Sequence, residues 1–216
     1  MADETVSDLI TLGRQLRNQV DLEKMEGQLR SADLDDRLDS ALFSMSHLFY
    51  SGAVAENQIE NAISFQKLPK AITKHRAFMC RDEVATLRAW EGVSFGHTRN
   101  IIGSLAFLVA ILFLFESFVK FVIEGLGQEP PYKAWKLVIW LRDNTTIPSG
   151  DLDAIRFLNE YRNAWHELGV YSGNEISWDT LTLVPGERVP APSRAQSIEL
   201  LRKLVDVVLV VNSLRP

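Results

Sequence analysis

Two stretches of this chain are apolar around almost the whole circumference of a helix. One runs from Ile101 to Phe115 and contains no charged residue. The other follows Ser193, a residue suited to cap a helix, and extends to about Ser213. A helix that is apolar on all sides belongs in the middle of a bundle or in a dimer interface. The two stretches therefore predict a mainly α fold, an antiparallel helical bundle.

The length of the first stretch also bears on whether it crosses a membrane. A transmembrane helix needs about 20 consecutive apolar residues. Here Arg99 precedes the run, and Glu116 and Lys120 interrupt its far side. Glu116 stands four residues before Lys120, which is the favourable order on a water-facing helix. We therefore expect a buried core helix rather than a membrane segment over Ile101 to Ile123.

Apolar residues recur at helical spacing in other parts of the chain. The helices expected from this spacing are Thr5 to Leu29, Leu34 to Tyr50, Val54 to Leu68, Asp82 to Gly92 and Tyr132 to Asn144. Ser51-Gly52 is expected to end the second of them. In the last, the residues expected to point inward are Trp135, Val138, Ile139 and Leu141.

A small β-hairpin is expected before the C-terminal helix. Residues Glu175 to Val184 alternate with a period of two, which is the pattern of a strand. Pro185-Gly186 is a turn signal, and Arg188 to Pro190 can return as a short edge strand.

Composition limits the classes of function. The 216 residues are 46% hydrophobic and 24% charged, with a net charge of -5, so no overall charge attracts nucleic acid. A contact with nucleic acid would need a local basic patch, such as Lys70 to Arg81.

The single cysteine, Cys80, indicates a reducing compartment, and the acidic start Met1 to Glu4 is not a secretory signal. We expect a cytoplasmic protein.

Several common sites have no pattern in this sequence. No glycine spacing matches a phosphate-binding loop, and no Ser or Cys nucleophile motif is visible. The histidines at 47, 75, 97 and 166 are not paired at the spacing of zinc ligands. We expect neither a cofactor nor a metal. A polar cluster at Gly96 to Asn100 is a minor candidate, interpreted mainly as a helix cap or exposed surface.

The most informative polar pattern lies in Asp151 to Leu168, which is expected to form one helix. Ser149 or Asp151 can cap its start, and Gly169 stands where a helix stops. Its apolar stripe consists of Phe157, Leu158, Tyr161, Trp165 and Leu168. Its opposite stripe consists of Asn159, Arg162, Asn163 and His166, with Arg156 and Glu160 to one side, where they can pair with each other.

This polar stripe carries residues suited to chemistry on phosphodiesters. Arg162 and His166 are neighbours at i, i+4. A histidine can take or give a proton near neutral pH, and an arginine can hold a phosphate and stabilise charge that builds on it. Asn159 and Asn163 can orient either group. The set suits metal-free cleavage of RNA, in which the 2′-hydroxyl is the nucleophile; the alternative is a stripe that is structural or simply exposed.

The segment Arg162-Asn163-x-x-His166-x-x-Gly169-x-Tyr171 resembles the HEPN (higher eukaryotes and prokaryotes nucleotide-binding) superfamily. That family consists of small helical bundles with an Arg-x-His motif on a late helix. Its motif has four to six residues between the Arg and the His, whereas three separate Arg162 from His166. The likeness covers about Ala106 to Leu214, through the order of helices and the hairpin.

The resemblance implies a metal-independent RNA endonuclease of a toxin–antitoxin or antiviral defence system. It also implies a homodimer whose two motifs meet, an RNA substrate and a partner such as an antitoxin. Arg162, His166, Asn163 and Asn159 would be the catalytic set. Residues 1–100 would form an N-terminal helical region beside a HEPN-like region at 101–216, unless the whole chain is one continuous domain. The alternative function is a non-catalytic interaction module.

Overall fold

The computed structural model describes residues 2–20, 34–64, 105–166 and 169–215, and these residues confirm a mainly α fold. The only strands of the described chain form a two-stranded hairpin before the last helix. In chain order the elements are α1 (Ala2–Arg17), α3 (Leu34–Ser64), α6 (Leu105–Gly125), α7 (Ala134–Asn144), α8 (Ser149–His166), β1 (Ile176–Trp178), β2 (Leu181–Leu183) and α9 (Arg194–Asn212).

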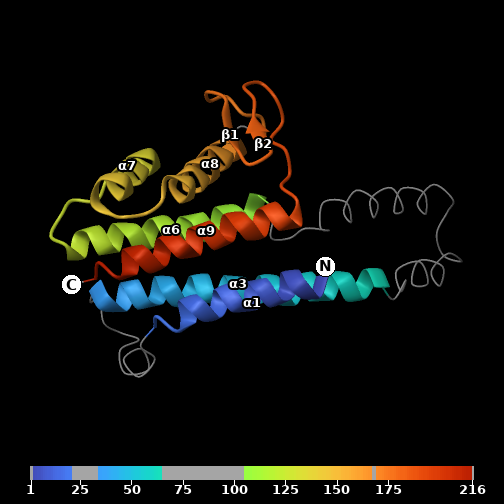
Figure 1. The fold of residues 1–216 in the computed structure, drawn as a ribbon, viewed down its shortest axis with the longest axis horizontal. Coiled ribbons are helices and arrows are strands. Elements are labelled where there is room, and N and C mark those ends of the chain that lie inside the picture. The colour runs from blue at the N-terminus through green and yellow to red at the C-terminus, as the bar shows by residue number, and fades with distance from the viewer. Residues whose placement is uncertain (1, 21–33, 65–104, 167–168, 216) are drawn as a thin grey trace, which may run out of the picture.

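The helices pack in three layers (Figure 1). Helices α1 and α3 form one outer layer, α6 and α9 form the middle layer, and α7 and α8 form the other outer layer. The middle layer contacts both outer layers: α3 and α1 pack against α6 and α9 on one side, and α8 packs against both on the other. The hairpin lies beside α8 and contacts that helix through β1.

The middle layer supplies much of the core, as its sequence predicts. On α6 the buried apolar residues are Leu108, Ile111, Leu112, Phe115, Phe118, Val119, Val122 and Ile123. On α9 they are Ile198, Leu200, Leu201, Leu204, Val205, Val207, Val208 and Val211. Within the described ranges, no helix has the length and apolar character needed to cross a membrane. The expectation of a buried core helix for the charge-free run is confirmed for the part of α6 from Leu108 onward.

Helices α1 and α3 approach each other closely at Gly13. A Cβ atom at this position would lie 3.1 Å from Cβ of Phe49 and 3.3 Å from the carbonyl oxygen of Ser46. The Ser46 hydroxyl donates a hydrogen bond of 2.8 Å to the carbonyl oxygen of Gly13. A glycine inside a helix normally destabilises it, but here the missing side chain lets the two backbones meet.

The helix boundaries in this layer differ from the expected ones. α3 is continuous through Ser51-Gly52, so the predicted break is wrong. Phe49 and Ala53 are both buried on the same side, and packing along this face outweighs the cost of one glycine, about 1 kcal/mol. α1 ends at Arg17 instead of continuing to Leu29.

The remaining N-terminal expectations lie outside the described residues. They are the helix at Asp82 to Gly92, the basic segment Lys70 to Arg81, Cys80 and the cluster Gly96 to Asn100.

The hairpin is present, but its turn is not where the sequence pattern suggested. β1 and β2 pair antiparallel with Trp178 opposite Leu181, so the chain reverses at Asp179-Thr180, inside the alternating run. Asp179 adopts a φ of 52°, a left-handed conformation that aspartate tolerates better than most residues. Arg188 pairs with Val170 as an isolated bridge instead of forming the second strand.

Helix α7 presents only part of the expected face to the core: Leu141 is buried and Val138 is half-buried against the core, as predicted. Leu137 and Leu141 are its buried residues. Trp135 is 52% exposed and Ile139 is 36% exposed, so the prediction that these two point inward is wrong. The pair Leu137 and Leu141 lies at i, i+4 and forms the contact face, while Trp135 and Ile139 form a second i, i+4 pair turned away from it.

Helix α9 begins as its sequence predicts. Ser193 is the N-cap residue, and its hydroxyl accepts a hydrogen bond from the backbone N–H of Gln196. The Gln196 side chain accepts one of 2.9 Å from the backbone N–H of Ser193. This reciprocal capping box fixes where the central helix starts.

Two phenylalanines of α6 provide a matched test of the layer arrangement. Phe118 is fully buried, whereas Phe113 is 65% exposed on the same helix. We expect Phe118→Ala to lower the free energy of unfolding by about 3–5 kcal/mol, because it leaves a cavity in the middle layer. Phe113→Ala should change it by about 0.5 kcal/mol or less. Urea unfolding followed by circular dichroism measures both, and equal effects would contradict the assigned faces of α6.

Candidate functional site

The helix that carries the polar stripe is fixed by its apolar face. Phe157, Leu158 and Tyr161 are buried, as expected. The Phe157 ring lies 6.0 Å, centroid to centroid, from both Tyr161 and Trp178 of β1, so the hairpin packs on the same face. The side chain of Trp165, and Leu168 entirely, fall outside the described residues.

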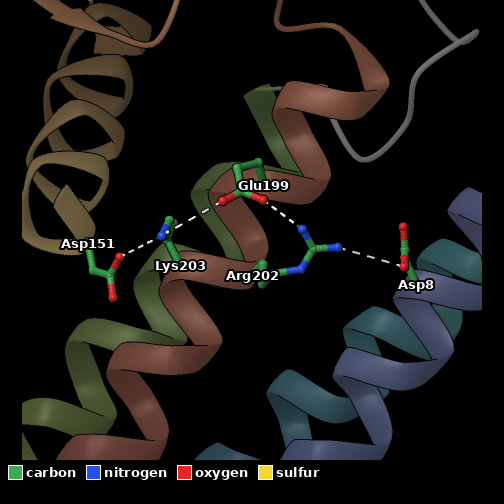
Figure 2. A network of polar contacts seen from close by, with 5 residues as sticks. All are labelled: Asp8, Asp151, Glu199, Arg202 and Lys203. Carbon is green, nitrogen blue, oxygen red and sulfur yellow. Dashed lines mark hydrogen bonds and ion pairs between the residues drawn. The ribbon is translucent and has the colours of Figure 1, made fainter. Parts of the chain in front are cut away.

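A charged network attaches the start of α8 to the rest of the bundle (Figure 2). Asp151, one of the two candidate caps, lies within the first turn of α8. Its carboxylate lies 2.9 Å from Nζ of Lys203 on α9. Lys203 and Arg202 both contact Glu199, and Arg202 reaches Asp8 of α1 at 3.8 Å. The hydrogen bond to Asp151 raises the pKa of Lys203 above its ordinary value. The network links all three layers at one level of the bundle.

Arg162 points from α8 into the boundary with the middle layer. Its Nη1 donates to Oε1 of Glu116 on α6, and the two form an ion pair. The side chains are 22% and 11% exposed, respectively, so the pair is largely shielded from water. Glu116 therefore does not face solvent beside Lys120, and that expectation is wrong.

Glu116 is the residue that sequence reasoning missed. It lies four residues after Leu112 and three before Val119, and both of these are buried. Helical spacing thus puts a carboxylate on the buried side of a core helix, where it needs a cationic partner. The buried position of Glu116 could therefore have been predicted from its spacing, although the sequence alone did not identify Arg162 as its partner.

Asn159 is more enclosed than a residue on a solvated stripe. It is 5% exposed, and its Oδ1 is buried without a hydrogen-bond partner among the described residues. Buried polar atoms nearly always have such a partner. Asn159 also lines a cleft between α7 and α8.

Asn163 is exposed, and its Nδ2 donates a long hydrogen bond of 3.4 Å to Glu160. The same carboxylate accepts one of 3.2 Å from the hydroxyl of Tyr171, which also donates to the carbonyl oxygen of Asn174 at 2.7 Å. Glu160 thus has partners other than Arg156, and the expected ion pair with Arg156 does not form. Burial, followed by the charge of Glu160, raises the pKa of Tyr171 to about 12.

His166 is the last residue of α8, one turn after Arg162. Its side chain is outside the described part of the chain, so the approach of its imidazole to Arg162 stays a prediction. Beyond it, Gly169 has a φ of 82° and donates a hydrogen bond of 2.9 Å to the carbonyl oxygen of Ala164. This is the geometry of a helix end that glycine favours, as the sequence indicated.

The cleft between α7 and α8 has a volume of about 420 Å³. One part of its lining is apolar and the other is polar and charged. The lining residues are Trp135, Val138, Ile139, Arg142, Ser149, Leu152, Asp153, Arg156, Asn159 and Glu160. Asn159 and Glu160 thus belong both to the polar side of α8 and to the lining of the cleft.

Two further findings bear on the kind of site. Among the residues described here, no group of three or more His, Cys, Asp or Glu side chains is placed to hold a metal ion.

The sequence matches no family model, no curated protein and no solved structure. The chemistry of α8 must therefore be argued from its own contacts.

Three residues of the expected catalytic set have described side chains, and these three lie in different environments. Arg162 is paired with Glu116 at the boundary with α6, Asn159 is buried beside α7, and Asn163 is exposed. Arg162 has five N–H donors, and the described contact with Glu116 involves Nη1. The remaining donors can still bind an anion that approaches from the exposed edge of the helix.

The Arg162–Glu116 pair should contribute measurably to stability. We expect a double-mutant cycle with Arg162→Met and Glu116→Leu to give a coupling energy of about 1–3 kcal/mol, because hydrogen bonds to charged groups are worth this much when shielded. The exposed Arg142–Asp143 pair on α7 is the matched control, and its coupling should be clearly smaller, because water screens exposed ion pairs. Equal coupling in the two cycles would contradict the shielded position of the first pair.

Tyr171 should make stability depend on alkaline pH. Its pKa is raised to about 12 in the folded protein, above about 10 for an ordinary tyrosine. Its contribution is therefore fully present below about pH 10 and is lost as the pH rises toward about 12. We expect Tyr171→Phe to flatten the fall of unfolding free energy over this range, measured by urea unfolding. Tyr132→Phe, at a site 93% exposed, should keep the wild-type slope. Parallel curves for wild type and Tyr171→Phe would refute the assignment.

Proposed function

We propose that this chain is a HEPN-like protein of the cytoplasm that cleaves RNA without a metal ion, as a toxin or in phage defence. The observation that carries the proposal is the position of Arg162: it is anchored by Glu116 on a continuous helix that reaches His166 one turn later. An anchored guanidinium loses little side-chain entropy when it binds a phosphate, which favours binding at a defined position. The helical bundle with a hairpin before the last helix agrees with the resemblance.

In the proposed reaction the 2′-oxygen of one nucleotide attacks the neighbouring phosphorus, and the bond to the 5′-oxygen breaks. One His166 takes the proton of the 2′-hydroxyl, and a second His166, from the other chain of a homodimer, gives a proton to the leaving oxygen. Arg162 holds the phosphate and stabilises the charge that builds on it. Asn163 is exposed beside it and can orient the phosphate, and Asn159 is the second supporting residue of the proposed set.

A non-catalytic interaction module is the second candidate, and a specific observation favours it. The Glu116 carboxylate already neutralises Arg162, and Asn159 is buried within the fold. Both contacts are also what a stripe with a structural role, or a role in dimerisation, would show. With this second function the chain binds a partner protein and turns over no substrate.

Cleavage of RNA in EDTA separates the two candidates. We expect purified protein to cleave total RNA or tRNA, and His166→Ala and Arg162→Ala to be slower by about 10²-fold or more, since each loses acid–base or charge stabilisation. Arg14→Ala removes an exposed arginine from α1, in the opposite outer layer, and should cleave like wild type.

Two results would contradict the proposed activity. Equal cleavage by all variants would assign the activity to a contaminant or another site. No cleavage by any variant, together with loss of stability in Arg162→Ala, would favour the interaction module.

A further inference from the structure

The cleft between α7 and α8 has the properties of a small-ligand site. Its volume of about 420 Å³ falls within the range of about 300–1,000 Å³ that such sites occupy. One wall is apolar, formed by Val138, Ile139 and Leu152, and Trp135 stands beside them with half of its surface exposed. An exposed indole next to a hollow offers a flat surface on which a planar ring can stack.

Asn159 supplies the polar contact for such a ligand. Only 5% of the residue is exposed, and it lines the cleft. Its Oδ1 has no hydrogen-bond partner in the described part of the chain. A buried acceptor left unpaired lowers stability. Oδ1 itself is enclosed, so a ligand in the cleft would meet the amide through Nδ2, which can donate a hydrogen bond.

The charges around the cleft favour a neutral ligand over an anion. Arg142 is bonded to Asp143 at 2.8 Å, and Glu160 accepts from Tyr171. The other two charged lining residues are Asp153 and Arg156, which have opposite signs and are both exposed. The lining thus has no excess of positive charge to hold a phosphate.

We propose that this cleft binds a single nucleobase, with the ring against Trp135 and Nδ2 of Asn159 donating to a ring nitrogen or carbonyl oxygen of the base. Nucleobases combine a stacking face with acceptors at the ring edge, and proteins that bind single-stranded nucleic acid use aromatic side chains in this way. The binding site is inferred from the cleft alone; only its use as a base subsite for an RNA substrate rests on the proposed function.

Calorimetric titration of the full chain with the four ribonucleosides tests the site. We expect saturable binding of at least one nucleoside with a dissociation constant of about 1 mM or tighter. Trp135→Ala and Asn159→Leu should each weaken it by about tenfold or more, because one loses stacking and the other the hydrogen-bond donor. Tyr132→Ala removes an exposed aromatic residue that does not line the cleft, and it should bind like wild type.

Two more titrations distinguish a nucleobase site from a phosphate site and from the proposed catalytic residues. The matching 5′-monophosphate should bind within about threefold of the nucleoside, because the lining has no net positive charge. His166→Ala should bind the nucleoside unchanged even if RNA cleavage is lost or never occurs, so the two proposals fail separately. No nucleoside binding, binding insensitive to Trp135→Ala, or binding of monophosphates alone would each overturn the proposal; Trp135 is exposed, so its variant is not expected to unfold.

Discussion

Two helices with apolar residues on nearly all sides are stable in water only when other helices cover them from both directions. This requirement accounts for the order of the layers: α6 and α9 lie in the middle, with α1 and α3 on one face and α7 and α8 on the other. It also explains why α8 is amphipathic, since one side of an outer helix must face the core. The position of α8, and hence of any site on it, depends on the burial of α6 and α9.

A charge inside this arrangement links the core to the proposed chemistry. Glu116 interrupts the apolar surface of α6 at a buried position, and Arg162 of α8 neutralises it. The ion pair couples the register of α8 to that of α6, because a shift of one residue would move the guanidinium about 100° around the helix. The same pair that helps to fix α8 therefore also sets how much of the Arg162 charge is available to a substrate in the proposed activity.

Patterns confined to one helix predicted most of the fold. The capping residue Ser193 and the buried run on α6 were identified because both signals are local. The errors arose where contacts between elements determine the end of a helix, the position of a turn or the buried face. Packing carries α3 through Gly52, and the hairpin turns at Asp179 without breaking the alternation on either side. Helical spacing also could not show that α7 packs through Leu137 instead of Trp135, since both residues begin an apolar i, i+4 pair.

The same limit applies to the candidate site. A helical projection places Asn159, Arg162 and Asn163 on one stripe. In the structure Asn159 lines the cleft beside α7, Arg162 lies at the boundary with α6, and Asn163 faces solvent. Asn159 and Arg162, about 60° apart around α8, face different neighbours because two helices flank it. The stripe is better described as two adjoining sites. At one, an anchored arginine can hold a phosphate; at the other, a buried amide and an exposed indole suit a base.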